Sequence, residues 1–254
     1  MAVSASDIVI YGSANMQESD SGSQGGAIDT STRIVFTDLA ANDTVDVSGS
    51  VAGAVQNVVI TGRTTTGAIT SETITLNGTT AAEGSTTFER ILKITCQGHP
   101  GTVTVYDNSN TEVIATLESG VETIRRPFYN VSADPTTGGG DKFFYEKVFV
   151  KNNNGSSALL NVSIAEQADG IDSAGSGSVD FDLESSQNGS NTSTNRATTP
   201  SSAMLGTFSS DTKSVPGTDL SPASGIGIWL RLSLPQGTSA ANSTYTLRVN
   251  GSTA

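Results

Sequence analysis

The sequence predicts an all-β protein made of two antiparallel β-sandwich domains, of the Ig-like or jelly-roll-like kind, with an extended N-terminal arm. Only 35% of the 254 residues are hydrophobic and 15% are charged, whereas Gly, Ser and Thr are abundant. Residues with β-branched side chains recur in short runs that alternate with polar residues, which is typical of half-buried strands. The chain length suits two sandwiches of about 125 residues each.

The first 33 residues combine a strand with a polar segment. The run VSASDIVIY has strand character, and residues 12–32 are too polar to fold alone. We expect residues 1–33 to form a strand and a flexible arm that neighbouring molecules hold in place; a long loop pinned to its own domain is the alternative. The apolar anchors of this assembly arm would be Ile8, Ile10, Tyr11 and Ile28.

Residues 34–126 are predicted to form the first sandwich. Alternating apolar residues at Val45 and Val47, and in the runs VQNVVITG and ETITLNG, indicate antiparallel strands. FERILKITC also fits helical spacing, but its β-branched residues favour a strand. The buried face of that strand would hold Phe88, Leu92, Ile94 and Cys96. TVTVY and EVIATL flank the sequence DNSN, whose Asp and Asn side chains favour a hairpin turn.

Residues 127–141 are predicted to be a linker, and residues 142–254 the second sandwich. The linker contains ADPTTGGGD, a turn sequence with three consecutive glycines. The next run, KFFYEKVFVKN, places large apolar side chains on both faces, so we expect a strand that is covered on both sides. The runs that complete this sandwich are ALLNVSI, VDFDLE, MLGTF, IWLRLSL and TYTLRVNG.

The sequence contains no recognisable catalytic motif. The single histidine, His99, lies in the turn sequence QGHPG with no nucleophile near it, and no G-x-S-x-G motif occurs. The single cysteine, Cys96, has no partner for an intrachain disulfide and is expected to be a buried, unreactive residue. Phosphate-binding glycine motifs are also missing. We therefore expect no enzymatic activity, no catalytic residues and no cofactor.

Carboxylates are the main candidates for metal binding. Asp180, Asp182 and Glu184 alternate with apolar residues, so a strand would direct all three to one face, where their oxygens could ligate Ca²⁺. We favour a solvated acidic face, because like charges are common on the exposed side of a strand. The turn at Asp107 could hold an ion in the same way, and there too we expect none.

Charge and hydropathy argue against two classes of partner. A net charge of −12 without a cluster of basic residues argues against binding to nucleic acid. No apolar run is long enough to span a bilayer, and the first basic residue is Arg33, so no leader-like segment is expected. We therefore expect neither a nucleic-acid partner nor a membrane contact.

Trp229 is the one residue with the shape of a sugar-stacking platform. It alternates with Ile and Leu residues in the run IWLRLSL, so it could lie exposed on the polar face of its strand. Packing beneath a neighbouring loop or subunit is the interpretation that we favour. Trp229 is therefore a possible contact residue in either case.

Three runs resemble structural proteins of tailed-bacteriophage particles. ITGRTTTGAITSETITLNGTT resembles the Ig-like repeats of such proteins. FYEKVFVKNNNGSSALLNVSI and GIWLRLSLPQGTSAANSTYTLRVNG resemble their β-sandwich modules. The resemblance implies a virion protein on the capsid surface, of the decoration or cement type, that bridges subunits of the major capsid protein. It also implies a homo-oligomer, for which we expect a trimer.

Two other functions fit the same architecture. One is a receptor- or glycan-binding module on the head or tail of the particle, with Trp229, Tyr245 or carboxylates as contacts. The other is a glycan-cleaving tail enzyme, which would need two carboxylates brought together by the fold. Saturable binding to cells would indicate the glycan-binding module, whereas stoichiometric binding to bare shells would indicate decoration.

Overall fold

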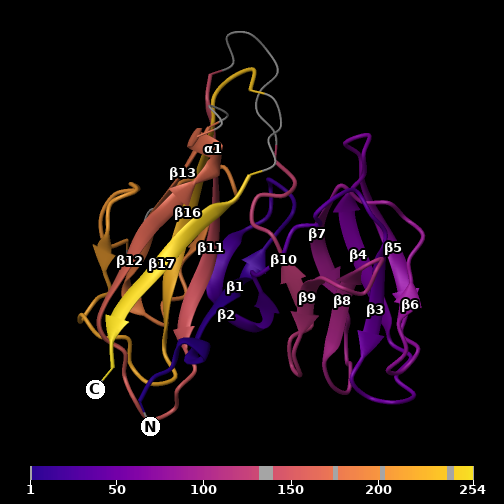
Figure 1. Cartoon of the computed structure of the whole chain (residues 1–254). Helices are drawn as coiled ribbons and strands as arrows, with labels where there is room; N and C mark the ends of the chain where they lie inside the picture. The colour runs from indigo at the N-terminus through magenta and orange to yellow at the C-terminus, as the bar shows by residue number, and fades with distance from the viewer. Residues whose placement is uncertain (1, 132–139, 174–176, 201–203, 239–242, 254) are drawn as a thin grey trace. The chain divides into compact units, whose positions relative to one another are not determined.

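The computed structural model describes residues 2–131, 140–173, 177–200, 204–238 and 243–253. The fold is all-β with several antiparallel sheets, as the sequence predicts (Figure 1). The chain divides into two compact units: unit 1 consists of Met1–Asp29 and Asn130–Ala254, and unit 2 consists of Thr30–Tyr129. None of the helices in these described ranges is long and apolar enough to cross a membrane.

Unit 2 is built from two sheets that enclose one apolar core. Its strands are β3 (Val45–Gly49), β4 (Asn57–Arg63), β5 (Ile69–Thr75), β6 (Ala82–Glu83), β7 (Arg90–Thr95), β8 (Val103–Asp107), β9 (Val113–Leu117) and β10 (Thr123–Arg125). The strand order is β10-β7-β4-β5 in one sheet and β6-β3-β8-β9 in the other. Buried side chains from both sheets, such as Ile60 of β4 and Val105 of β8, share one cluster. This arrangement is the sandwich that the alternating runs predict.

β7 is a strand, as predicted, but its buried face differs from the prediction. Thr61 of β4 pairs with Lys93, and Gly62 pairs with Ile91, so the residue between them, Leu92, has no partner in this ladder. This β-bulge shifts the alternation by one residue. The core therefore receives Ile91 together with Phe88, Ile94 and Cys96, whereas Leu92 is buried outside that cluster.

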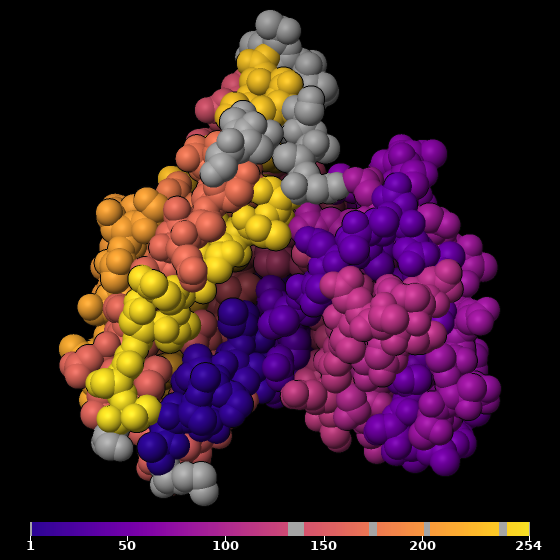
Figure 2. All heavy atoms as spheres, in the orientation of Figure 1, coloured from indigo at the N-terminus to yellow at the C-terminus, as the bar shows by residue number. Residues whose placement is uncertain are grey.

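Unit 1 holds the longest strands of the chain. Its elements are η1 (Ala5–Asp7), β1 (Ile8–Met16), the part of β2 (Gln24–Arg33) up to Asp29, β11 (Lys142–Asn152), β12 (Leu160–Asp169), α1 (Gly170–Ser173), β13 (Ser178–Gln187), β14 (Thr192–Ser193), β15 (Lys213–Ser214), β16 (Gly225–Leu234) and β17 (Tyr245–Ser252). One sheet has the order β13-β16-β11-β1-β2, and β15-β12-β17 form a second. Figure 2 shows β17, in yellow, at the surface of this unit, consistent with its alternately exposed residues.

The central strand of unit 1 is covered on both sides, as its sequence predicts. From Phe144 to Val150 every residue of β11 is buried, because β16 and β1 flank it and other chain segments cover both faces. Two of these buried residues, Glu146 and Lys147, are charged. A charged pair in the middle of such a strand needs partners in the interior.

The N-terminal segment forms the strand that its sequence predicts, and a second strand follows where a flexible arm was expected. Ile8–Met16 forms β1, which pairs with β11 in antiparallel register, and Gln24–Arg33 forms β2. The last residues of β2, Thr32 and Arg33, belong to unit 2, where they pair in parallel with β10. The polar side chains of this segment bury little apolar surface, but backbone hydrogen bonds to β11 hold it in the sheet. The segment is therefore ordered within its own chain. Of the predicted linker at 127–141, residues 132–139 lie outside the described ranges.

Candidate functional site

The four predicted assembly anchors lie within the sheet of their own unit. Tyr11 is buried and packs with Val9 and Phe149, and Ile28 packs against the same cluster. Ile8 pairs with Asn152 of β11, and Ile10 pairs with Val150. The anchors are Ile8, Ile10, Tyr11 and Ile28, and each is half-buried or buried here. They act as internal packing residues, because β11 supplies the partner strand that a neighbouring molecule was expected to supply.

Trp229 is a core residue and not an exposed sugar platform. Its side chain is fully buried in β16. A Cβ atom at Gly25 would lie 2.6 Å from Cη2 of the indole, so the ring packs directly against the backbone of β2. The exposed sugar platform is therefore wrong, and the segment that covers Trp229 is a strand of the same chain, where a neighbouring loop or subunit was expected.

The surroundings of His99 and Cys96 indicate that both residues have a structural role. Nε2 of His99 lies 2.7 Å from the carbonyl oxygen of Val121, and Nδ1 contacts the carbonyl oxygen of Gly101, so the ring ties its turn to the neighbouring chain. Cys96 is buried in the core of unit 2. Burial, and to a smaller extent the charge of Glu122, raise the pKa of its thiol and disfavour the reactive thiolate.

The turn at Asp107 is closed by hydrogen bonds to the carboxylate. Asp107 accepts hydrogen bonds from the hydroxyl of Ser109 and from the backbone N–H groups of Thr111 and Glu112. These bonds, that of Ser109 first, lower the pKa of Asp107 from 3.8 to about 2. The carboxylate therefore serves to fix the β8–β9 hairpin.

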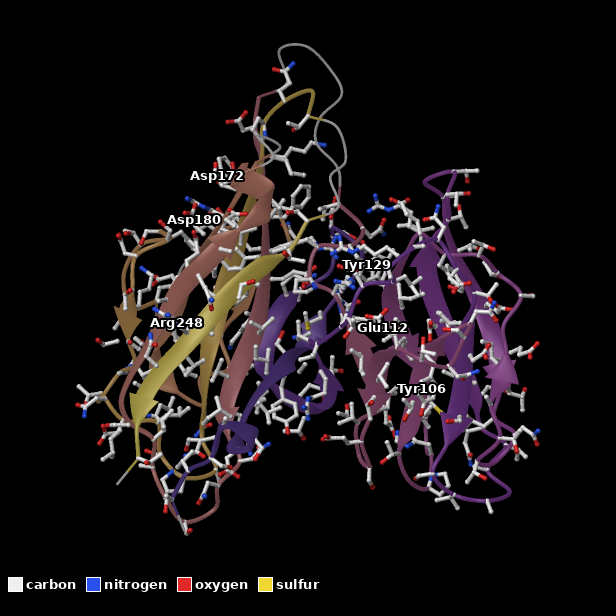
Figure 3. The ribbon with its side chains drawn as sticks, in the orientation of Figure 1. Tyr106, Glu112, Tyr129, Asp172, Asp180 and Arg248 are labelled. Carbon is white, nitrogen blue, oxygen red and sulfur yellow. The ribbon has the colours of Figure 1, made fainter. Side chains whose placement is uncertain are left out.

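The three carboxylates of β13 lie on one face, as predicted, but this acidic face (Asp180, Asp182 and Glu184) is not solvated. Asp182 and Glu184 are fully buried, and Asp180 is half-buried near the start of β13 (Figure 3). The chain between β13 and β16 covers the face: Asn191 and Gly206 contact it through hydrogen bonds to Glu184 and Asp182. The expectation of a solvated face is therefore wrong, because long-range loop packing decides the exposure of these residues.

Each carboxylate of the acidic face has its own cation. Oδ2 of Asp180 contacts Nη2 of Arg231 at 2.5 Å, on the neighbouring strand β16. Oδ1 of Asp182 lies 3.5 Å from Nζ of Lys213. Oε1 of Glu184 lies 2.7 Å from Nζ of Lys147. Across the described residues, no three His, Cys, Asp or Glu side chains gather in a group that could hold a metal ion.

The most buried ion pair joins Lys147 and Glu184, and neither side chain has exposed surface. Nζ of Lys147 also donates to the carbonyl oxygens of Gly26, at 2.7 Å, and Gly189, at 3.0 Å. The ring of Phe149 lies 4.6 Å from the same nitrogen. Burial lowers the pKa of the Lys147 ammonium, and the hydrogen bond and charge of Glu184 act in the opposite direction.

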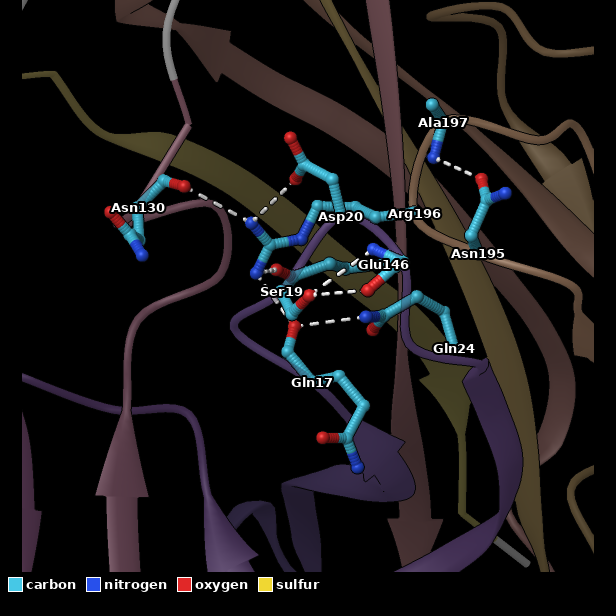
Figure 4. A network of polar contacts seen from close by, with 10 residues as sticks. Gln17, Ser19, Asp20, Gln24, Asn130, Glu146, Asn195, Arg196 and Ala197 are labelled. Atoms are coloured by element: carbon cyan, nitrogen blue, oxygen red, sulfur yellow. Dashed lines mark hydrogen bonds and ion pairs between the residues drawn. The ribbon is translucent and has the colours of Figure 1, made fainter.

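A second buried network surrounds Arg196 (Figure 4). Nη2 of Arg196 lies 3.1 Å from Oε1 of Glu146 and donates at 2.7 Å to the carbonyl oxygen of Gln17. Nη1 reaches the carbonyl oxygen of Asn130, at 3.2 Å, and the carboxylate of Asp20, at 3.4 Å. One guanidinium thus joins its own segment to three others, around residues 17–20, 130 and 146, which suits its planar array of five donors.

The sequence analysis missed Lys147, Glu146 and Arg196 as interior residues. The available signal was the pair Glu146 and Lys147 in a strand predicted to be covered on both sides, since buried charges require partners. Because these side chains are sealed from solvent, they hold the fold together and do not contact a dissolved ligand. A surface for a partner must be sought elsewhere.

Unit 2 offers such a surface at β5, the last strand of its sheet. The N–H of Leu76 donates to the carbonyl oxygen of Gln56, and that of Thr64 donates to the carbonyl oxygen of Ala68. Between these two pairs, every second residue of β5 exchanges backbone hydrogen bonds with the residue of β4 that lies opposite. The backbone groups of β5 that point away from β4 are therefore those of Ile69, Ser71, Thr73 and Thr75. In the described part of the chain, no other backbone hydrogen bond engages them.

We refer to these outward backbone groups of Ile69, Ser71, Thr73 and Thr75 as the open edge. All four residues are exposed. The side chain of their neighbour Glu72 accepts hydrogen bonds from the backbone N–H groups of Ser85, at 2.6 Å, and Thr86, at 3.0 Å, which anchors β5 to the segment that follows β6. An exposed, regular strand edge is a template for pairing with another chain.

Comparison with known proteins adds no further constraint. No family model matches the sequence, and neither a curated protein nor a solved structure does so.

Proposed function

We propose that the chain is a non-enzymatic structural protein of a tailed-bacteriophage particle, which decorates the capsid surface and stabilises the shell by bridging subunits of the major capsid protein. The observation that carries this proposal is the open edge of β5, because an unpaired strand edge can accept a strand from a neighbouring protein. The resemblance of three sequence runs to virion proteins indicates capsid subunits as the neighbours.

The open edge suits a repeated structural contact. Ser71, Thr73 and Thr75 present short polar side chains, so affinity would come mainly from backbone hydrogen bonds and would be modest for one edge. A trimer would present three edges, and binding several sites at once would raise the apparent affinity well above that of one edge. The homo-oligomer, and the trimer that we expect, rest on the resemblance to decoration proteins.

Shell binding by two variants at Thr73 tests this proposal. Thr73→Pro removes one outward N–H but no hydrogen bond to β4, and proline is tolerated on edge strands. Thr73→Ala keeps the N–H and is the matched control. We expect the wild type and Thr73→Ala to bind bare shells of the encoding phage at stoichiometric occupancy, and Thr73→Pro to lose most of this binding while its circular dichroism is unchanged.

Two outcomes would contradict the proposal. Full occupancy by Thr73→Pro would exclude the open edge as the contact. Saturable binding of the purified wild type to host cells, together with no binding to shells, would favour a receptor-binding module instead.

A further inference from the structure

Lys147, Glu184 and Asn191 form a buried triad of an amine, a carboxylate and a carboxamide. Oε1 of Glu184 accepts hydrogen bonds from Nζ of Lys147, at 2.7 Å, and from Nδ2 of Asn191, at 3.1 Å. Because both bonds end on the same oxygen, the distance between Nζ of Lys147 and Nδ2 of Asn191 cannot exceed the sum of the two hydrogen-bond lengths. The backbone carbonyl oxygen of Asn191 also lies 3.4 Å from Nζ, which places this residue beside the amine.

The surroundings of the triad are closed to solvent, and they combine aromatic rings with the backbone carbonyl oxygens of Gly26 and Gly189. The ring of Phe149 lies 4.6 Å from Nζ and that of Trp229 lies 5.8 Å away. Neither Lys147 nor Glu184 has exposed side-chain surface. Burial lowers the pKa of the Lys147 ammonium and so favours the neutral amine, while the hydrogen bond and charge of Glu184 act in the opposite direction.

One oxygen of the carboxylate is free to carry a proton. Oε2 of Glu184 is buried and, among the described residues, has no hydrogen-bond partner. A Cβ atom at Gly227 would lie 2.6 Å from this oxygen, so only glycine leaves it room on β16. Oε2 is therefore the carboxylate oxygen of Glu184 that is left open to accept a proton.

We propose that Lys147 and Asn191 join in an isopeptide bond, with Glu184 as the proton carrier. Glu184 takes a proton from the ammonium of Lys147, and the neutral Nζ attacks Cγ of Asn191. The Nζ–Cγ bond forms and the Cγ–Nδ2 bond breaks. Glu184 transfers a proton to the departing nitrogen, which leaves as ammonia, and the second proton lost by Nζ restores the acid. No oxidant, reductant or cofactor is needed.

The bond would tie β11 to the segment that follows β13. It would close the interior of unit 1 covalently in a chain whose single cysteine, Cys96, lies in the core of unit 2. This inference does not rest on the proposed capsid function. A shell-binding defect and an absent cross-link are therefore separate results.

The intact mass of the purified full-length chain tests the cross-link directly. We expect a mass lower than that of the sequence by one ammonia, with Met1 either kept or removed. Trypsin cuts after Lys142, Lys151 and Arg196, so the digest should contain a branched peptide that joins residues 143–151 to 152–196. Fragmentation should place the branch at Lys147 and Asn191.

Variants identify each role in the triad. Lys147→Arg and Glu184→Gln should restore the full mass, because one lacks the nucleophile and the other the proton carrier. Asn191→Asp should lose one water in place of ammonia. Lys151→Arg is the matched control: Nζ of Lys151 lies 2.7 Å from Oδ1 of Asn153, but at the surface, and this variant should keep the mass loss.

The wild-type protein alone can overturn the inference, whatever the variants do to folding. A mass equal to that of the sequence, with tryptic cleavage after Lys147, would show that no bond forms. An ammonia loss that persists in Lys147→Arg, or that reverses by hydrolysis at alkaline pH, would identify a cyclised asparagine and would also overturn it.

Discussion

The Nζ atom of Lys147 lies 2.7 Å from Oε1 of Glu184, and both side chains are fully buried. An isolated charge at this position has no access to water, so each residue requires the other. The pair is a constraint on the fold of unit 1 as much as a source of stability, since its Coulomb attraction is offset by the cost of desolvation.

Removing one member of this pair is therefore expected to be costly. In an Asn191→Ala background, in which the proposed cross-link cannot form, Lys147→Met should lower the free energy of unfolding by about 3–5 kcal/mol, because Glu184 is left buried without a cation. The double variant Lys147→Met with Glu184→Leu should recover a large part of the loss, because no unpaired charge remains. Urea unfolding measures both. A Lys147→Met variant as stable as this background would contradict the buried pair.

Trp229 gives a second prediction for the same unit. Trp229→Ala should lower the free energy of unfolding by about 3–5 kcal/mol, since it removes a fully buried indole. Phe143→Ala is the control, because Phe143 is 41% exposed and its truncation leaves a smaller cavity. Thermal unfolding followed by circular dichroism separates the two. Equal, small losses in both variants would place Trp229 outside the core.

Deletion of Met1–Asp29 tests the internal role of β1. The deletion removes the strand that covers one edge of β11 and the packing of Tyr11 on Phe149. We expect loss of the cooperative unfolding of unit 1, while unit 2, which begins at Thr30, keeps its transition. Calorimetry measures the two transitions. A truncated chain that keeps both would show that this segment is an arm after all.

The lowered pKa of Asp107 predicts how the stability of the folded chain depends on pH. Its pKa is lowered from 3.8 to about 2 in the folded chain, chiefly by the hydrogen bond from Ser109. The stabilisation is therefore fully present above pH 3.8 and is lost as the pH falls through about 2. A carboxyl titration by NMR should give a midpoint near 2 for Asp107. A midpoint near the ordinary value would mean that the β8–β9 hairpin is not closed by this carboxylate.

The fold class and many strands could be predicted from local patterns. Alternation placed Val45 and Val47 in the core, and the two apolar faces of β11 predicted its burial. The bulge at Leu92 could not be predicted, because it depends on which residues of β4 lie opposite. One extra residue in a ladder reverses the faces that alternation assigns.

The interior charges could not be predicted for a related reason. Asp182 and Glu184 follow the same alternation as exposed acids would, and only the covering chain between β13 and β16 decides that they are buried. The partners Lys147 and Lys213 lie far from them in the sequence. The polar N-terminal segment was misjudged because backbone pairing, which side-chain composition does not report, holds it in the sheet.

Electron cryo-microscopy of the complete particle tests the proposed function most directly. The account predicts ordered density for this chain on the outer surface of the capsid, in symmetric copies, with β5 of unit 2 paired to a strand of a neighbouring protein. Density for the chain on the tail, or on the capsid with the edge of β5 exposed to solvent, would contradict it.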